Sequence, residues 1–339
     1  MPRLTPPIKA AVVGYGPAFN MGAHHANLMK QTGRIEVAAV CDRDESRLEA
    51  AREELGDVQT FTDVAELAAV ADLQLASVVV PHNVHEKVAV ALLEAGKHVA
   101  VEKPMAIRVE ECDRMIEAAR KAGVTLSVFH NRRQDGDFRA IKDTIEQGYI
   151  GEVFHLEAAS GGFSEPRGEG WWRSDKAVSG GAFYDWGAHF MDWVLNLVPG
   201  RITTVTGQFQ KRVWDRVTNE DHCETFIRFD SGAAAHVQLS SICAAPKPRW
   251  YILGTKGAIV DSGGGQFTVY TRTGSYTASF EVKYYESAWA GYYEKLADHL
   301  IDDAQNPVTP ESARRVIAVL ELAEKASQSG QEQSVPYER

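Results

Sequence analysis

The sequence predicts an α/β protein built from a doubly wound parallel sheet and a second α/β domain with a large open, mainly antiparallel sheet. Over the first 130 residues, short apolar runs typical of buried strands alternate with helical patterns. From about residue 150, the strand-like runs alternate apolar and polar residues and are separated by turns. A chain of 339 residues is long enough for two cores. We therefore expect domains at 1–130 and 131–339, with the last helix free to pack back on the first domain.

The first strand and its glycine turn carry the earliest functional signal. The apolar run Ile8–Val13 leads into Gly14 and Gly16, and a helical pattern follows from Gly22. Glycine allows a tight turn at the strand end and lets a pyrophosphate approach the backbone, while the helix start favours phosphate. A second apolar run ends at Asp42, placed to accept hydrogen bonds from an adenosine ribose. This order predicts a Rossmann domain that binds a dinucleotide.

The loop departs from the usual G-x-G-x-x-G spacing. Five residues separate Gly16 from the third glycine, so Ala18, Phe19 and Asn20 are expected to take part in cofactor binding in a longer loop. An ordinary structural glycine turn is the alternative interpretation. Asp42 favours NAD because a carboxylate repels a 2′-phosphate, whereas Arg43 beside it leaves NADP open.

Composition excludes several classes of partner. Hydrophobic residues make up 44% and charged residues 24% of the chain, and the formal net charge is −10 without a basic run. Nucleic acid and anionic membrane are therefore not expected as partners. The four cysteines are scattered without metal-ligand spacing, and neither a secretion signal nor a membrane-spanning run is found. We expect a cytoplasmic protein.

The remaining elements follow in order. In the first domain, strands are predicted near 59–61, 75–80, 98–104 and 124–130, and helices at 45–55, 63–71, 84–95 and 109–122. In the second domain, a helix at 138–147 precedes a strand at 152–159, a helical run at 182–198 and two final helices at 291–304 and 310–327. Further strands are predicted at 203–209, 224–229, 233–240, 250–253, 258–261, 267–270 and 276–280.

Chemically active side chains follow two more strands of the parallel sheet. Ligands collect at the carboxyl ends of such strands. The turn from Pro81 to His85 and the sequence Glu102-Lys103-Pro104 both occupy this position. Lys103, held before a proline, is the main candidate, with a solvated loop lysine as the alternative.

A second group lies in the run GGAFYDWGAHFMDW. Asp185 and His189, four residues apart, are predicted to share one helix face, where His189 could pass a proton and Asp185 could orient it or a substrate hydroxyl. A surface pair is the alternative, and no metal site is predicted because a third ligand is missing from this stretch. Trp172, Arg132, Arg133 and Arg173 are candidates for the substrate pocket, and the arginines leave an acidic sugar open.

Together these motifs resemble the glucose–fructose oxidoreductase / inositol dehydrogenase / MocA (Gfo/Idh/MocA) family. The similarity includes VVGYG…CD, the P-x-N-x-x-H turn, EAGKHVAVEKP, NRR at 131–133, the G-G-x-x-x-D-x-G-x-H run from Gly180 and the closing VTPESARRVIAVLELAEKA. It covers nearly the whole chain. The resemblance implies the predicted fold, an NAD(P)-dependent dehydrogenase acting on a sugar, sugar acid or polyol hydroxyl, and a homodimer or homotetramer.

The resemblance also implies roles for individual residues. Lys103 would contact substrate and cofactor, Asp185 would position the substrate, and His189 would be the general acid/base. Substrate contacts are expected from Arg132, Trp172, Arg173, Asp185 and His189, and cofactor contacts from Gly14, Gly16, Ala18, Phe19, Asn20, Asp42, Arg43, Pro81, Asn83, His85, Glu102 and Lys103. An NAD-dependent glycosidase and a non-catalytic cofactor- or sugar-binding sensor are the alternatives that the family offers.

Overall fold

The computed structural model describes residues 3–168 and 170–336, and the chain divides into two compact units. The first unit comprises Met1–Asn131 and Trp289–Arg314, and the second comprises Arg132–Ala288 and Arg315–Arg339. The expected domains placed all of 131–339 in the second part, whereas Trp289–Arg314 belongs to the first unit. Its helix is bound there by polar contacts: the Arg34 guanidinium donates to Asp298 at 2.7 Å, and the Tyr293 hydroxyl lies 2.6 Å from His25 Nδ1. The ends of the chain at 1–2 and 337–339, and residue 169, lie outside the described residues.

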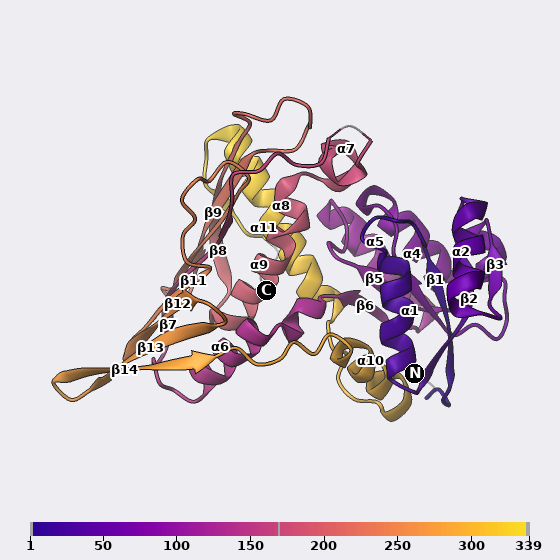
Figure 1. The fold of residues 1–339 in the computed structure, drawn as a ribbon, viewed down its shortest axis with the longest axis horizontal. Helices are drawn as coiled ribbons and strands as arrows, with labels where there is room; N and C mark the ends of the chain where they lie inside the picture. Colours follow the sequence, from indigo (N-terminus) through magenta and orange to yellow (C-terminus); the bar gives the residue numbers. More distant parts are fainter. Residues whose placement is uncertain (1–2, 169, 337–339) are drawn as a thin grey trace. The chain divides into compact units, whose positions relative to one another are not determined.

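The first unit is the predicted alternation of strands and helices (Figure 1). Its strands are β1 (Ile8–Val13), β2 (Ile35–Cys41), β3 (Gln59–Phe61), β4 (Leu75–Val78), β5 (His98–Glu102) and β6 (Leu126–Phe129). Its helices are α1 (Met21–Gln31), α2 (Glu45–Leu55), α3 (Val64–Ala68), the 3₁₀ turn η1 (His82–Val84), α4 (His85–Glu94), α5 (Val109–Ala122) and α10 (Gly291–Asp302).

All strand pairs in this sheet are parallel, in the order β3-β2-β1-β4-β5-β6. Every residue of β4, β5 and β6 is buried, which explains why these strands read as continuous apolar runs. Side chains that precede two helices cap them: Asp44 accepts from the Ser46 N–H, and Asp63 from the Ala65 N–H. The predicted doubly wound Rossmann sheet is confirmed.

The second unit contains the remaining elements. Its helices are η2 (Asn131–Gln134), α6 (Gly136–Glu146), η3 (Trp172–Ser174), α7 (Lys176–Ser179), α8 (Ala182–Asp185), α9 (Gly187–Leu197) and α11 (Pro310–Ser329); η2 and α11 each have residues in both units. Its strands are β7 (Val153–Gly161), β8 (Ile202–Gln210), β9 (His222–Phe229), β10 (Ala234–Ser240), β11 (Trp250–Gly254), β12 (Gly257–Gly263), β13 (Gln266–Thr273), β14 (Tyr276–Lys283) and β15 (Gln333–Ser334).

These strands form one sheet in the order β14-β13-β12-β11-β7-β10-β9-β8-β15. Every pair is antiparallel except β7 with β10, so the prediction of a mainly antiparallel sheet is confirmed, and β15 was not predicted. In β9 and β10, buried residues alternate with half-buried or exposed residues. The reason is visible in Figure 1, where α9 and α11 cover one face of the sheet and leave the other face without helices.

The predicted helical run at 182–198 is divided in the structure. Helix α8 ends at Asp185 and α9 begins at Gly187, with Trp186 between them. The His189 N–H donates to the Trp186 carbonyl at 3.0 Å, a three-residue rather than a four-residue step. Asp185 and His189 therefore do not share one continuous helix, although Trp186 keeps helical dihedral angles (φ −83°, ψ −34°).

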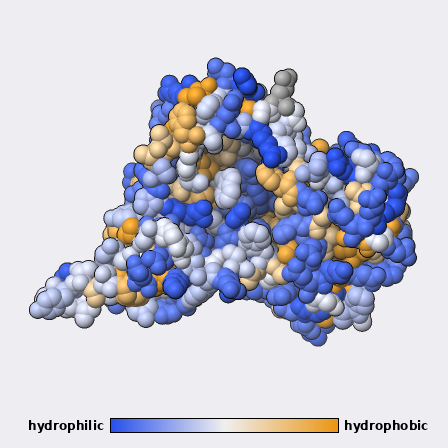
Figure 2. All heavy atoms as spheres, in the orientation of Figure 1, coloured by the Kyte–Doolittle hydropathy of each residue, from blue (hydrophilic) through white to orange (hydrophobic). Residues whose placement is uncertain are grey.

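Hydrophilic side chains predominate on the visible face of both units, with apolar groups in scattered patches (Figure 2). Within the described chain, no helix combines the length and apolar character needed to cross a membrane.

Candidate active site

The strand register of the first unit brings several predicted residues to one sheet edge. Val13 pairs with Cys41 on one side and with Val78 on the other, and Val78 pairs with Val101. Since the strands are parallel, the residues after these positions lie at the same edge of the sheet. The order of the strands reverses between β1 and β4, which is the point where open α/β sheets bind ligands.

Two glycines of the turn are required by close packing. Gly14 has φ +99°, and a Cβ there would lie 2.1 Å from the Val79 carbonyl oxygen. A Cβ on Gly22 would lie 2.6 Å from the Gly14 carbonyl oxygen, so the first turn of α1 packs against the strand end as the third glycine of a dinucleotide motif does. Gly16 differs, because no atom lies within 4 Å of its ideal Cβ position. The backbone at Gly16 is therefore open to an approaching group.

The lengthened loop has an unusual backbone. Phe19 and Asn20 are consecutive non-glycine residues with positive φ, at 58° and 51°. Such conformations cost free energy and concentrate at functional sites. The Phe19 side chain is 62% exposed, and Asn20 directly precedes α1. Ala18, Phe19 and Asn20 therefore lie beside the helix start that favours phosphate.

Asp42 follows β2 beside the glycine turn, as predicted. Its two carboxylate oxygens accept hydrogen bonds from the backbone N–H groups of Tyr15 (2.7 Å) and Asp44 (3.0 Å). These bonds hold the carboxylate at the sheet edge with acceptor sites to spare, because a carboxylate offers about four. Arg43, next in the chain, is exposed.

The turn after β4 is joined to the turn after β5 by a buried histidine. The ring nitrogens of His85 lie 2.9 Å from the Pro104 carbonyl oxygen (Nδ1) and 2.9 Å from the Val80 carbonyl oxygen (Nε2). Burial lowers the pKa of His85, although the two carbonyls oppose this shift. Its side chain is fully buried, so His85 connects two backbone turns, while Pro81 is partly exposed and Asn83 is exposed.

Glu102 is fixed by a buried polar network that the sequence did not predict. One carboxylate oxygen lies 3.0 Å from His25 Nε2, and the other accepts the Lys103 N–H at 2.9 Å. His25 Nδ1 lies 2.6 Å from the Tyr293 hydroxyl and 3.0 Å from Ser77 Oγ. Burial raises the pKa of Tyr293, so the phenol stays protonated and can donate to His25. The network connects the first helix to the turn that carries Lys103, which is partly exposed.

In the second unit, Asp185 is paired with a predicted neighbour. Arg173 Nη1 donates to Asp185 Oδ1 at 2.8 Å, and the guanidinium also lies 4.6 Å from the ring centre of Trp172. The Arg173 carbonyl accepts a hydrogen bond from Asn219 Nδ2 at 2.6 Å. Arg173 thus holds the Asp185 carboxylate, and Asn219 in turn holds the backbone of Arg173.

His189 lies in α9 between two tryptophans. Its ring centre is 5.7 Å from that of Trp186, edge-on, and 6.4 Å from that of Trp193, in a stacked arrangement. Trp193 is fully buried and its indole N–H donates to the Arg132 carbonyl at 2.9 Å. His189 itself is 5% exposed, so packing fixes its ring plane.

The other two predicted arginines also have carboxylate partners. Arg132 Nη1 donates to Asp135 at 2.9 Å, and its guanidinium lies 4.6 Å from the ring centre of Trp186. Arg133 forms a bidentate pair with the buried carboxylate of Asp192, at 2.6 Å and 2.8 Å. Each predicted arginine therefore faces a negative charge of the protein itself.

The residues of the glycine turn fit a dinucleotide, because Gly16 is open where a Cβ would otherwise stand and Gly14 and Gly22 keep the turn tight. No group of three His, Cys, Asp or Glu side chains suited to a metal ion is found among residues 3–168 and 170–336.

Sequence reasoning missed several residues behind the site. His25, Ser77 and Tyr293 support Glu102, and Asp192 binds Arg133. His25 lies just after the glycine loop in the sequence, but its partners are 52, 77 and 268 positions away in the chain. No local signal connects such residues.

Comparison with known proteins supports the family resemblance that the sequence motifs predicted. The oxidoreductase family with an NAD-binding Rossmann fold matches residues 8–130, and the GFO/IDH/MocA C-terminal domain matches residues 138–260. The chain is 27% identical over 346 residues to scyllo-inositol 2-dehydrogenase (NADP(+)) IolW of Bacillus subtilis, covering 94% of both chains. It is 28% identical over 256 residues to myo-inositol 2-dehydrogenase of Thermotoga maritima, covering 74% of both. The crystal structure of an NAD-binding protein from Listeria innocua has a TM-score of 0.84 at 27% identity and 97% coverage of both chains.

The fold and the sheet edge thus define an NAD(P)-dependent dehydrogenase of the class that acts on CH–OH groups. The chain belongs to the Gfo/Idh/MocA family, and the resemblance that its motifs predicted is confirmed.

Proposed function

We propose that this dehydrogenase acts on a hydroxyl group of a neutral cyclic polyol or sugar. The observation that carries the proposal is the pairing of all three candidate arginines with carboxylates of the same unit. An arginine already bound to a carboxylate gains little from a second, substrate-borne one, because the local charge is neutralised. A sugar acid is therefore the less favoured substrate class.

His189 is proposed as the general acid/base. An imidazole can accept a hydroxyl proton near neutral pH, and the plane of the His189 ring is fixed by Trp186 and Trp193. When bound, the nicotinamide supplies the redox chemistry by accepting a hydride from the carbon that bears this hydroxyl. The reverse reaction returns the proton from His189 to the carbonyl oxygen.

Asp185 and Lys103 complete the proposed set. The Asp185 carboxylate accepts a hydrogen bond from a substrate hydroxyl while Arg173 holds its other side. The Lys103 ammonium, at the turn that Glu102 and its network fix, stabilises negative charge that develops on the substrate oxygen. Both roles rest on the family's motif and on the local contacts of each residue.

The names of two relatives support this proposed substrate class. Two curated relatives are inositol dehydrogenases, one of scyllo-inositol and one of myo-inositol. Inositols are neutral cyclic polyols, in agreement with the neutralised arginines. We therefore put cyclitols first in the substrate search.

We propose NAD as the preferred cofactor. Asp42 keeps a negative charge beside the glycine turn, where it would repel the 2′-phosphate of NADP. The exposed Arg43 and the NADP(+)-dependent relative make NADP the necessary comparison.

The test is the absorbance of reduced nicotinamide while the protein meets cyclitols, sugars and sugar acids, with NAD and NADP in parallel. We expect reduction with a cyclitol or neutral sugar, and a decrease in turnover on the order of 10³-fold in both His189→Ala and Lys103→Ala. Lys87→Ala, an exposed lysine of α4, serves as the matched control. Cofactor binding should persist in all three variants.

Two outcomes would reject the proposal. Full turnover in both His189→Ala and Lys103→Ala would remove the assigned chemistry. Reduction with sugar acids alone would reject the neutral substrate. Hydrolysis of aryl glycosides without net nicotinamide change would instead identify the glycosidase activity known in the family.

We further propose a cytoplasmic homo-oligomer that uses the face of the nine-stranded sheet without helices. The side chains of His155, Glu157, Glu224 and His236 line a hollow on this unit. His155 Nε2 lies 3.3 Å from Glu157 of the same strand, and His236 Nε2 lies 3.1 Å from Glu224 of the neighbouring strand. The proposed cytoplasmic location agrees with the state of a thiol in the first unit. Burial raises the pKa of the Cys41 thiol to about 11, which keeps this thiol protonated and unreactive. Light scattering of the purified protein would reject the assembly if it gave a monomer mass.

A further inference from the structure

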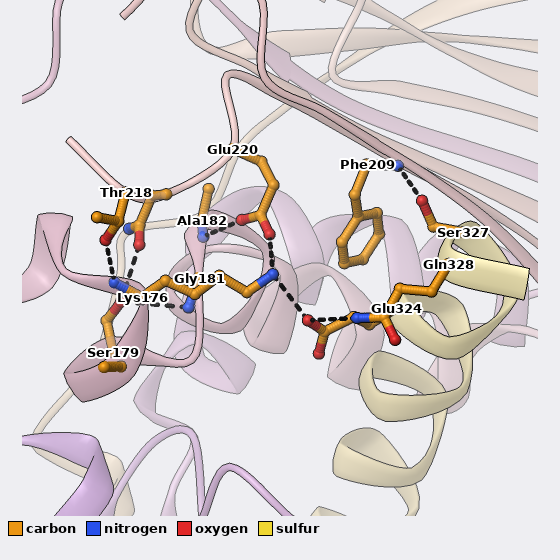
Figure 3. Close-up of polar contacts among 12 residues, drawn as sticks. Lys176, Ser179, Gly181, Ala182, Phe209, Thr218, Glu220, Glu324, Ser327 and Gln328 are labelled. Carbon is orange, nitrogen blue, oxygen red and sulfur yellow. Dashed lines mark hydrogen bonds and ion pairs between the residues drawn. The ribbon is translucent and has the colours of Figure 1, made fainter. Parts of the chain in front are cut away.

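The first turn of α8 is bound by a carboxylate from a distant part of the second unit. Glu220 Oε2 accepts the Ala182 N–H at 3.1 Å, the first backbone donor of the helix that ends at Asp185. Figure 3 shows the Glu220 side chain directed at this N–H from the segment that precedes β9. An unpaired N–H at a helix start needs such an acceptor, and no side chain of the Gly181 cap position can supply it.

The backbone is shaped to admit this carboxylate. Gly181 has φ +116°, and a Cβ there would stand 2.7 Å from Glu220 Oε2. Any other residue at this position would push the carboxylate away from the helix start. The contact with Glu220 therefore explains why the second position of the G-G-x-x-x-D motif is a glycine in this chain.

Glu220 is held in turn by a lysine that bridges two carboxylates. Lys176 Nζ forms ion pairs with Glu220 and with Glu324 of α11, the latter at 2.7 Å (Figure 3). The side chains of Glu220 and Glu324 are 10% and 16% exposed, so these charges are poorly screened by water. Burial lowers the pKa of Lys176, but the hydrogen bonds that its ammonium donates to Glu220 and Glu324 raise this pKa more, and the lysine stays charged.

The two residues before Glu220 bind the same region. Thr218 Oγ1 accepts the Lys176 N–H at 2.7 Å, and Asn219 Nδ2 donates to the carbonyl of Arg173 at 2.6 Å. Arg173 is the partner of Asp185. The 218–220 segment thus reaches Asp185 along two routes, through the start of α8 and through Arg173.

We propose that Glu220, oriented by Lys176, is a positioning residue that sets where Asp185 and His189 stand. This inference rests on the proposed function of those two residues. Glu220 touches no reacting group in the proposed mechanism and acts through the backbone of α8. Displacement of a catalytic group by about 1 Å can cost as much as 10²-fold in rate, so loss of this contact should be visible in turnover.

Glu324 provides a matched control, because it shares Lys176 with Glu220 but, among the residues that the structure describes, forms no hydrogen bond or ion pair with the start of α8. We expect Glu220→Ala to lower kcat about tenfold and Glu220→Gln about threefold, since an amide oxygen can still accept the Ala182 N–H. Glu324→Ala should lose comparable thermal stability with kcat nearly unchanged. The Kd for the reduced cofactor should not change in any variant.

Hydrogen exchange of the backbone gives a readout independent of activity. The Ala182 amide and its neighbours to residue 189 should exchange faster in Glu220→Ala than in Glu324→Ala. Wild-type kcat in Glu220→Ala, or an equal loss of kcat in the two alanine variants, would overturn the positioning role. If the wild-type protein oxidised no polyol, the proposed function would fail, while unchanged exchange at Ala182 would separately reject the anchoring.

Discussion

The two units hold their candidate residues in different ways. At the sheet edge of the first unit, Gly14, Asp42 and Lys103 each directly follow a strand, and parallel register aligns them. In the second unit, Asp185 and His189 stand on two short helical segments whose positions depend on contacts with distant residues. Asp185 pairs with Arg173, 12 positions away, and Glu220 reaches Ala182 across 38 positions. The first arrangement follows from strand order, whereas the second depends on ion pairs and buried polar groups.

The glycine turn gives the largest expected effect in this comparison. Gly14→Ala combines a positive φ with a Cβ placed 2.1 Å from a backbone oxygen, so we expect a loss on the order of 4 kcal/mol in unfolding free energy and loss of cofactor binding. Denaturant unfolding and titration with reduced nicotinamide measure both.

Gly33→Ala is the matched control, because Gly33 also has positive φ (64°) but no atom within 4 Å of its Cβ position. It should lose only about 1 kcal/mol and retain cofactor binding. Equal losses in the two variants would show that close packing at Gly14 does not matter.

Breaking the long-range ion pair between Arg133 and Asp192 should have the next largest effect on the unfolding free energy. Arg133→Met leaves the Asp192 carboxylate, which is 3% exposed, without its bidentate partner, and we expect a loss of about 3 kcal/mol. The double variant with Asp192→Leu should recover part of this loss, because both charges are then absent. Thermal or denaturant unfolding of the single and double variants measures the coupling, and simple additivity would contradict it.

Acid should weaken the second unit through Asp221. Burial raises the pKa of this carboxylate. The hydrogen bonds that it accepts from Lys211 and from the backbone N–H groups of residues 212–214 lower the pKa by more, so that it falls to about 2. Because the folded pKa lies below the unfolded value of 3.8, the group stabilises the protein above pH 4 by about 2 kcal/mol, and this contribution is lost as the pH falls toward 2.

The difference in unfolding free energy between the wild-type protein and Asp221→Asn isolates this group from other carboxylates. It should be largest near pH 6 and shrink steadily below about pH 4. A difference independent of pH would mean that the ionised form of Asp221 carries no special stability.

The long-range network of the first unit should contribute the least to stability. Tyr293→Phe removes the hydroxyl beside His25 Nδ1 and should cost about 1 kcal/mol. Tyr292→Phe, on the same helix, removes a buried hydroxyl that donates to Ser127 instead, and should cost a similar amount. We expect turnover to fall only in Tyr293→Phe, because only Tyr293 belongs to the network behind Glu102 and Lys103. Equal turnover in the two variants would restrict that network to a role in stability.

The sequence was most informative where function depends on local order. The glycine turn, Asp42 and the Glu102-Lys103-Pro104 turn became candidates because each needs only a strand and the residues that follow it. It was least informative where a partner came from elsewhere in the chain. The proposal of a neutral rather than an acidic substrate rests on the paired state of Arg132, Arg133 and Arg173. The partners of Arg133 and Arg173 lie 59 and 12 positions away, where no spacing rule connects them.

The two kinds of sheet and the family were predictable from local sequence patterns. Apolar periodicity reports burial on one face or both, and short motifs report the turns that a dinucleotide requires. Three features became apparent only in the folded protein: α10 belongs to the first unit, the predicted helix divides at Trp186, and Glu220 binds the start of α8. These features arise from side chains that meet after the chain folds, and their free energy depends on burial and geometry that local patterns do not encode.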